Sequence, residues 1–137
     1  MSLSGGCFFS PKGKGSKMYH QIRIGIEQGV CVIRLIGQQY CSYEPIEELK
    51  EDLRLVIEHG HVHLIALDCS NVVSVSIEMH TLLTDIAKQL ESAKGRFTLF
   101  CVSSAVQEYW NALARLTGPS ALMIYETKQE AIDQAKK

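Results

Sequence analysis

The chain has 137 residues, of which 46% are apolar and 21% charged, the composition of one ordinary globular domain. A wholly disordered chain is excluded because this much apolar surface offsets the entropy of ordering. No apolar run approaches the ~18–20 residues of a membrane-spanning helix, and the formal net charge of -1 lacks the basic excess of a nucleic-acid-binding domain. We therefore expect neither membrane insertion nor a nucleic-acid partner.

Residues 1–19 are predicted to form a flexible basic tail. They combine lysines with many glycines and serines, contain no acidic residue, and lack the apolar segment of a secretory signal. The single folded domain is expected over residues 20–137.

The cysteines suggest a cytoplasmic protein. Cys31, Cys69 and Cys101 lie in apolar, strand-like segments, and no C-x-x-C pair exists, so these three are predicted to be buried, reduced thiols. His61 and His63 could share one face of a strand, but no third ligand is evident. Solvated histidines are the better account, and neither a metal nor another cofactor is expected.

The first elements in chain order form an antiparallel hairpin. Isoleucines alternate with other residues over 22–27, and segment 30–36 is apolar at nearly every position. Gln28 and Gly29 provide the tight turn between these two strands.

A first helix follows, with Pro45 in its first turn and an apolar stripe that runs to Ile57. It is expected to end at His59 and Gly60, where glycine can take the left-handed cap. A buried strand over 63–69 and a loop over 68–76 lead into the second helix.

The second helix has a leucine-rich face and Gly95 beyond its end. A strand over 96–102 precedes a third helix, expected to begin with a capping box of Ser104 and Gln107 and to bury Leu116. A last strand over 121–125 leads to a fourth helix, whose capping box is formed by Thr127 and Glu130.

The order of elements is therefore ββαβαβαβα, with four helices. Strands separated by helices need crossover connections, which make a sheet parallel. The fold class is α/β, with a mixed, mostly parallel sheet and an N-terminal β-hairpin.

Five segments in this order resemble the STAS domain, a family named for sulfate transporters and anti-sigma factor antagonists. The resemblance rests on the second strand with its glycine and on the central strand with Asp68. It also rests on the serine-rich start of the third helix, the end of that helix, and the start of the last helix. These segments are VCVIRLIG (30–37), LIALDCSN (64–71), FTLFCVSSAV (97–106), LARLTG (113–118) and ETKQEAI (126–132).

The resemblance implies a phosphoacceptor serine at the start of the second helix. Regulatory members of the family carry Asp-Ser-Ser-Gly there, and an anti-sigma factor with serine kinase activity phosphorylates one serine. The corresponding residues here are Ser74-Val75-Ser76-Ile77. Ser76 falls at the acceptor position, with Ser74 as the alternative, and the aspartate and the glycine of the motif are missing.

Helix capping alone is the other interpretation of these serines, since serine is a preferred N-cap residue. If a partner docks here, its surface is expected to involve side chains from the neighbouring loops and helix starts. The candidates are Tyr40, Ser42, Tyr43, Asn71, Ser74, Ser76, Glu78, Ser103 and Tyr109. Packing over the sheet edge explains one of the two loop tyrosines equally well.

No catalysis is expected. Ser76, His80 and Asp85 could supply a nucleophile, a base and an acid, but they lie along a single helix without an oxyanion motif.

The resemblance thus implies a bacterial anti-sigma factor antagonist or a related partner-switching regulator of transcription, which acts by reversible protein binding. Two alternatives are a cytosolic accessory component of a lipid or anion transporter and a small-ligand-binding STAS domain. A ligand binder should show an apolar pocket of about 300 Å³ or more. A homodimer is left open.

Overall fold

The computed structural model describes residues 19–118 and 122–137. The predicted basic tail lies outside the described residues except for Tyr19. The main sheet has the strand order β1-β2-β4-β6-β7. β1 (Ile22–Glu27) and β2 (Val30–Leu35) form the predicted antiparallel hairpin, and Gln28 and Gly29 turn it with positive φ angles of 54° and 82°.

The remaining strands of this sheet are parallel, as the alternation of strands and helices predicts. They are β4 (Leu64–Asp68), β6 (Arg96–Phe100) and β7 (Met123–Tyr125). The predicted α/β fold with an N-terminal hairpin and four helices is therefore confirmed. The predicted strand over 121–125 begins at residue 121, and residues 119–121 lie outside the described residues.

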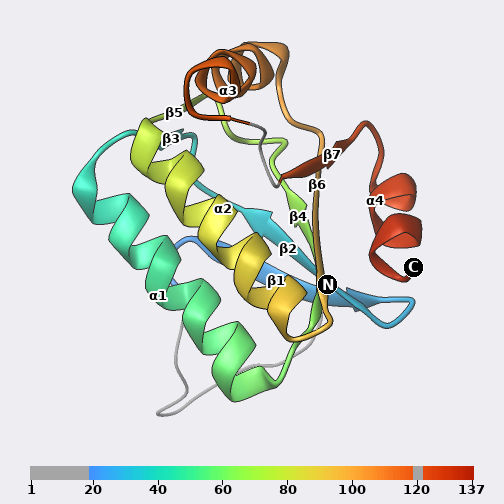
Figure 1. The fold of residues 1–137 in the computed structure, drawn as a ribbon. Helices are drawn as coiled ribbons and strands as arrows, with labels where there is room; N and C mark the ends of the chain where they lie inside the picture. The colour runs from blue at the N-terminus through green and yellow to red at the C-terminus, as the bar shows by residue number, and fades with distance from the viewer. Residues whose placement is uncertain (1–18, 119–121) are drawn as a thin grey trace.

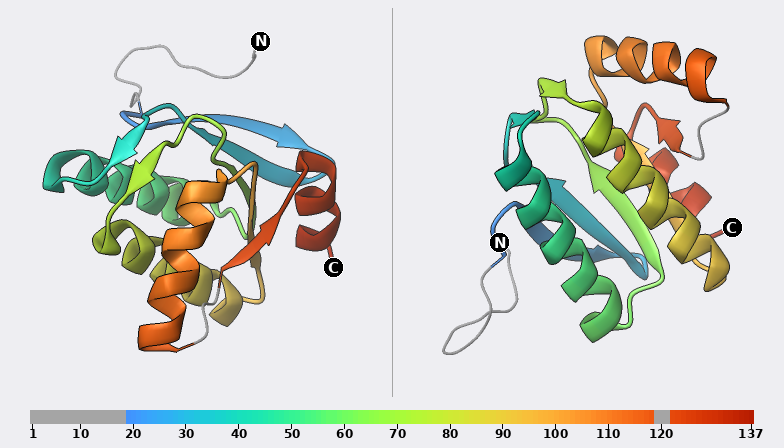
Figure 2. Two further views of the ribbon diagram at one scale, coloured as in Figure 1. Left: turned by 90° about the horizontal axis from the view of Figure 1, so that it is seen from above. Right: turned by 60° about the vertical axis from the view of Figure 1, so that its left-hand side comes forward.

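The helices cover the sheet unequally. Figure 1 shows α1 (Tyr43–Gly60) and α2 (Ile77–Ser92) side by side on one face, while α4 (Lys128–Ala135) packs on the other. Figure 2 shows α3 (Ser104–Thr117) beyond the end of the sheet, near the start of α2. Within the described residues, no helix is long and apolar enough to cross a bilayer.

Two apolar clusters hold these layers together. The larger one lies between the sheet and α1 and α2, with Leu49, Leu83 and Leu90 fully buried. The smaller one joins α4 to the opposite face of the sheet, where the Thr98 hydroxyl donates to the Ala131 carbonyl oxygen at 3.0 Å.

Two very short strands, not predicted from the sequence, lie beside the main sheet. β3 (Gln39–Tyr40) pairs in parallel with β5 (Ser74–Val75). The expected loop over 68–76 is therefore partly a strand. Because α1 begins shortly after β3 and α2 begins directly after Ser76, this pairing sets the N-terminal ends of the two helices beside each other.

Several expected helix ends are corrected. Ser103, not Ser104, caps α3 by accepting from the Val106 N–H at 3.2 Å, and the Gln107 amide donates to the Val102 carbonyl instead of completing a box. His61, not Gly60, adopts the left-handed conformation after α1. The Thr127–Glu130 capping box is present as predicted.

Two burial predictions are wrong. Leu116, expected on the buried face of α3, is 83% exposed, because the helix ends beyond the edge of the core. Cys101 follows β6 directly with a positive φ of 58°, which turns it out of the strand and exposes it. Cys31 and Cys69 are buried as expected.

Candidate functional site

The loop before α2 is fixed to the loop before α1 by backbone hydrogen bonds. The N–H groups of Val73 and Ser74 both donate to the Gln38 carbonyl, at 2.7 and 3.2 Å. The Ser76 N–H donates to the Tyr40 carbonyl at 3.0 Å. The backbone that presents the candidate serines is thus held in one arrangement.

Ser76 is the N-cap residue of α2. Its backbone is extended, with φ -110° and ψ 177°, and its hydroxyl accepts from the Met79 N–H at 3.4 Å. The side chain is half-buried. The hydroxyl therefore lies at the positive end of the helix dipole, which favours negative charge. The only acidic residue in the first turn, Glu78, is exposed.

Ser74 occupies a different environment, on β5 rather than at a helix end. It is also half-buried, and its hydroxyl accepts from the Cys41 thiol, with 3.4 Å between sulfur and oxygen. Of the two candidate acceptors, only Ser76 has its oxygen bonded to a helix-end N–H group.

Exposed apolar side chains surround these serines. Tyr43 is 78% exposed, Val73 60% and Ile77 48%. Tyr43 and Ile77 are the first residues of α1 and α2, whose ends the β3–β5 pairing brings together. We call the surface formed by Ser42, Tyr43, Val73, Ser74, Ser76, Ile77 and Glu78 the cap surface.

Within the cap surface, Ser42 is the N-cap residue of α1 but makes no side-chain cap hydrogen bond. Val73 and Ile77 were not predicted as site residues. The sequence signal that could have identified them is the pair of large apolar side chains beside a serine-rich loop. Such side chains are more simply interpreted as buried in the core.

Tyr40 corrects an expectation of surface exposure. It is fully buried, and its hydroxyl accepts from the Gly37 N–H at 3.0 Å, so it closes the loop after β2. The packing interpretation therefore applies to Tyr40, whereas Tyr43 is the exposed tyrosine. Asn71 is exposed and anchors its loop by donating to the Leu35 carbonyl at 3.2 Å.

The remaining two candidates belong to α3. Ser103 is half-buried at its N-cap, and Tyr109 is 37% exposed while its neighbour Trp110 is 3% exposed. This agrees with the expectation that adjacent residues on a helix face different ways. α3 packs near β5, so these residues border the cap surface without being part of it.

The geometry does not assemble the hypothetical catalytic set. The Ser76 hydroxyl accepts from backbone, and in the part of the chain that the structure describes no hydrogen bond joins the side chains of Ser76, His80 and Asp85. His61 and His63 are both exposed. Among residues 19–118 and 122–137, no group of three or more His, Cys, Asp or Glu side chains could hold a metal ion.

Comparison with known proteins gives a consistent family. A family model described as "STAS domain" matches residues 21–131. No curated protein matches the chain. Solved structures do match. One is a putative anti-sigma factor antagonist from Thermotoga maritima, with a TM-score of 0.67 and 21% identity over 87% of this chain and 97% of that one.

Two other structures with the same fold differ in biological setting. The phosphorylated form of the Bacillus cell fate determinant SpoIIAA has a TM-score of 0.58 and 22% identity over 82% of this chain and 97% of that one. The murine anion transporter Slc26a9 has a TM-score of 0.57 and 16% identity, over 79% of this chain but only 18% of the transporter. At these identities the likeness concerns the fold.

Proposed function

The chain belongs to the STAS domain family, and from this membership we propose that it binds a protein partner reversibly through the cap surface. In this proposal it is an anti-sigma factor antagonist or a related partner-switching regulator. The observation that carries the proposal is Ser76, an N-cap serine among exposed apolar side chains on a backbone held by hydrogen bonds.

The cap surface suits protein binding for two physical reasons. Exposed apolar side chains, tyrosine above all, supply the contact area that dominates interface energies. Hydrogen bonds from Val73, Ser74 and Ser76 to the neighbouring loop already hold the backbone. Little conformational entropy is then lost when a partner docks, which favours affinity.

Phosphorylation of Ser76 would act on this surface through charge. A phosphoryl group adds about -1.5 to -2 charge and three acceptor oxygens. The first-turn N–H groups of α2 and its dipole stabilise that charge, so the fold should persist while the cap surface becomes strongly negative. Ser74 is the second candidate acceptor, without a helix end to receive its phosphate.

The partner proposed is an anti-sigma factor with serine kinase activity, in a bacterial cytoplasm. The negative charge on the cap surface and directly beside it fits a partner of complementary sign. Glu44 and Glu78 lie in the first turns of α1 and α2, and both are exposed. Basic residues at the rim of the docking site, opposite these exposed carboxylates, would speed association. A phosphate on Ser76 would instead lie inside the contact area without an opposite charge, and it would weaken binding. The protein itself is proposed to bind rather than to catalyse.

A pull-down of the tagged chain from its native cell, with phosphopeptide mass spectrometry on the bait, tests the proposal. We expect a serine kinase of the anti-sigma type to co-purify, and phosphate on Ser76. The Tyr43→Ala variant should lose this partner, whereas Leu116→Ala, which truncates an equally exposed side chain at the far end of α3, should keep it.

Two outcomes would overturn the proposal. If both variants retain the partner equally, binding does not use the cap surface. If an unmodified bait recovers a transporter subunit or only a second copy of this chain, the serines act as helix caps and the protein is an accessory component or a dimer.

A further inference from the structure

The strand β1 lies at an edge of the main sheet. The strand order is β1-β2-β4-β6-β7, so in the described part of the chain β1 pairs with β2 alone (Figure 2). The Ile36 N–H donates to the Gln21 carbonyl at 3.0 Å, and hydrogen-bonded pairs of an antiparallel ladder recur at every second residue. The odd-numbered residues of β1 therefore bond to β2, while the N–H and C=O groups of Ile22, Ile24 and Ile26 point away from it.

Only the second half of this edge is free. Ile22 is 3% exposed, Ile24 is half-buried and Ile26 is 67% exposed. Among residues 19–118 and 122–137, no backbone hydrogen bond from outside the β1–β2 ladder reaches Ile24 or Ile26. Gln28, with its positive φ, ends the strand at Glu27. An exposed strand edge with apolar side chains is a template for another strand, and here the available segment is residues 23–27.

Arg23 carries a charge without a counter-charge. It is exposed and forms no ion pair with any residue of 19–118 or 122–137. Its cross-strand neighbour is Arg34, which is itself paired with Asp68 at 3.4 Å. Like charges directly opposite each other on a sheet are destabilising. A carboxylate on the open side of β1 would therefore compensate Arg23.

We propose that β1 pairs with β1 of a second copy of this chain, antiparallel and around a two-fold axis at Gly25. Ile24 then lies opposite Ile26 of the second copy, and both have outward backbone groups, so each such pair can exchange both hydrogen bonds. Arg23 lies opposite Glu27 of the second copy, and symmetry repeats this ion pair. Oε2 of Glu27 accepts from Lys128 Nζ at 3.0 Å, which leaves the other carboxylate oxygen for the arginine.

The neighbouring two-fold registers fit the edge less well. An axis at Ile24 would require pairing at Ile22, which is covered, and an axis at Ile26 would require pairing at Gln28, beyond the end of the strand. Only the axis at Gly25 uses the exposed segment and joins opposite charges. The interface contains no residue of the cap surface, so the dimer would present two cap surfaces, and it can fail without affecting the proposed function.

Sedimentation equilibrium of the full chain tests this interface. Pairing over residues 23–27 belongs to the class of small, weak interfaces, those under about 1,200 Å², so we expect a dimer that forms between about 0.01 and 1 mM. Ile26→Pro should abolish the dimer, because proline removes an outward N–H that the β1–β2 ladder does not use and is tolerated at such edge positions. Circular dichroism and urea unfolding check that each variant is folded.

Charge reversal tests the register. Arg23→Glu places like charges opposite each other twice and should weaken the dimer at least about tenfold, whereas Arg115→Glu, the same change in the last turn of α3, should not. The double variant Arg23→Glu/Glu27→Arg restores opposite charges and should dimerise within about threefold of the parent. Within one chain, Arg23→Glu removes the repulsion from Arg34, so it should not destabilise the fold.

Three results would each overturn the proposal. A chain that stays monomeric at about 1 mM would mean that the edge is left to water or to another protein. A dimer that survives in Ile26→Pro would mean that the copies meet through another surface. A double variant that dimerises no better than Arg23→Glu alone would mean that Arg23 and Glu27 do not face each other.

Discussion

Substituting Ser76 by alanine and by aspartate separates its role as a helix cap from its proposed role as a switch. Alanine removes the oxygen that accepts from the Met79 N–H, whereas an aspartate carboxylate can accept that hydrogen bond and adds a negative charge. Each role therefore predicts a different order of the variants in stability and in partner binding.

The magnitudes follow from the geometry. Loss of a serine N-cap costs about 1 kcal/mol, and the 3.4 Å separation at Ser76 favours the lower end of the range of about 0.5–2 kcal/mol. Aspartate keeps the cap and gains about 0.3–1 kcal/mol from the dipole, partly offset by repulsion from Glu78. Ser76→Ala should thus be less stable than the parent, and Ser76→Asp about as stable.

Partner binding should follow the opposite order. A new charge buried without compensation in an interface costs about 2 kcal/mol or more, which corresponds to a loss of about thirtyfold or more in affinity. Ser76→Ala adds no charge and should bind within a few-fold of the parent. Ser74→Asp, which puts the same charge on β5, is the matched control for position.

Urea unfolding and calorimetric titration with the captured partner measure the two quantities. The switch hypothesis fails if Ser76→Asp binds as tightly as the parent protein. A stronger effect for Ser74→Asp than for Ser76→Asp would instead move the acceptor to β5. Equal stability of the alanine and aspartate variants would refute the capping argument itself.

Three further predictions concern the fold. Gly95→Ala should lower the free energy of unfolding by at least about 2 kcal/mol, because the added Cβ would lie 2.1 Å from a backbone carbonyl oxygen. Gly25→Ala should not, because no atom lies within 4 Å of its added Cβ, and chemical denaturation compares the two variants. Burial raises the pKa of Cys31 to about 12, so a thiol reagent at pH 8 should label exposed Cys41 and spare Cys31 until the protein unfolds. Burial lowers the pKa of His80 from its ordinary value of 6.5, so the unfolded chain takes up a proton more readily than the folded protein. The free energy of unfolding should therefore fall as pH drops below about 6.5, and it should fall less in the His80→Gln variant.

The main elements were predictable because local patterns and tertiary packing agree. The isoleucine alternation of β1, the leucine face of α2 and the Thr127–Glu130 box all depend on residues a few positions apart. Such local patterns predict the same element whatever the rest of the chain contributes. The N-cap position of Ser76, at the start of an apolar helical face, belongs to the same class.

The predictions that are wrong concern residues whose burial depends on contacts with distant parts of the structure. Tyr40 is buried because its hydroxyl closes onto Gly37 and its strand pairs with β5, more than thirty residues away. Leu116 continues the apolar stripe of α3, but the helix extends past the core, so the stripe has nothing to cover at that end. Neither fact is encoded in local spacing.

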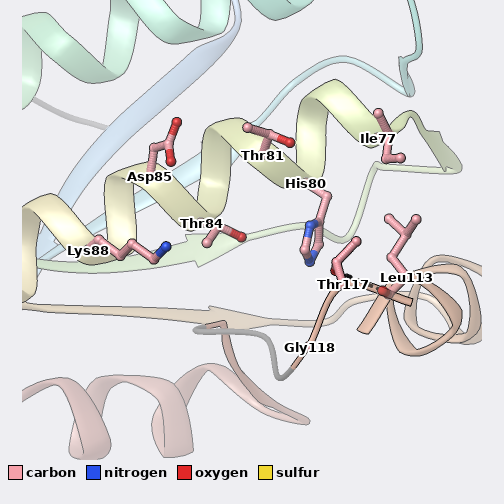
Figure 3. Close-up of a pocket in the computed structure, with 9 residues that line it drawn as sticks. All are labelled: Ile77, His80, Thr81, Thr84, Asp85, Lys88, Leu113, Thr117 and Gly118. Carbon is pink, nitrogen blue, oxygen red and sulfur yellow. Dashed lines mark hydrogen bonds between the residues drawn. The ribbon is translucent and has the colours of Figure 1, made fainter. Parts of the chain in front are cut away.

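The polar side chains between α2 and the end of α3, shown in Figure 3, illustrate the same limit more strongly. His80 and Thr84 are ordinary polar residues in the α2 sequence, and Trp110 appears as a core residue of α3. Only the packing of α3 near the start of α2 brings them together and leaves their polar atoms without partners.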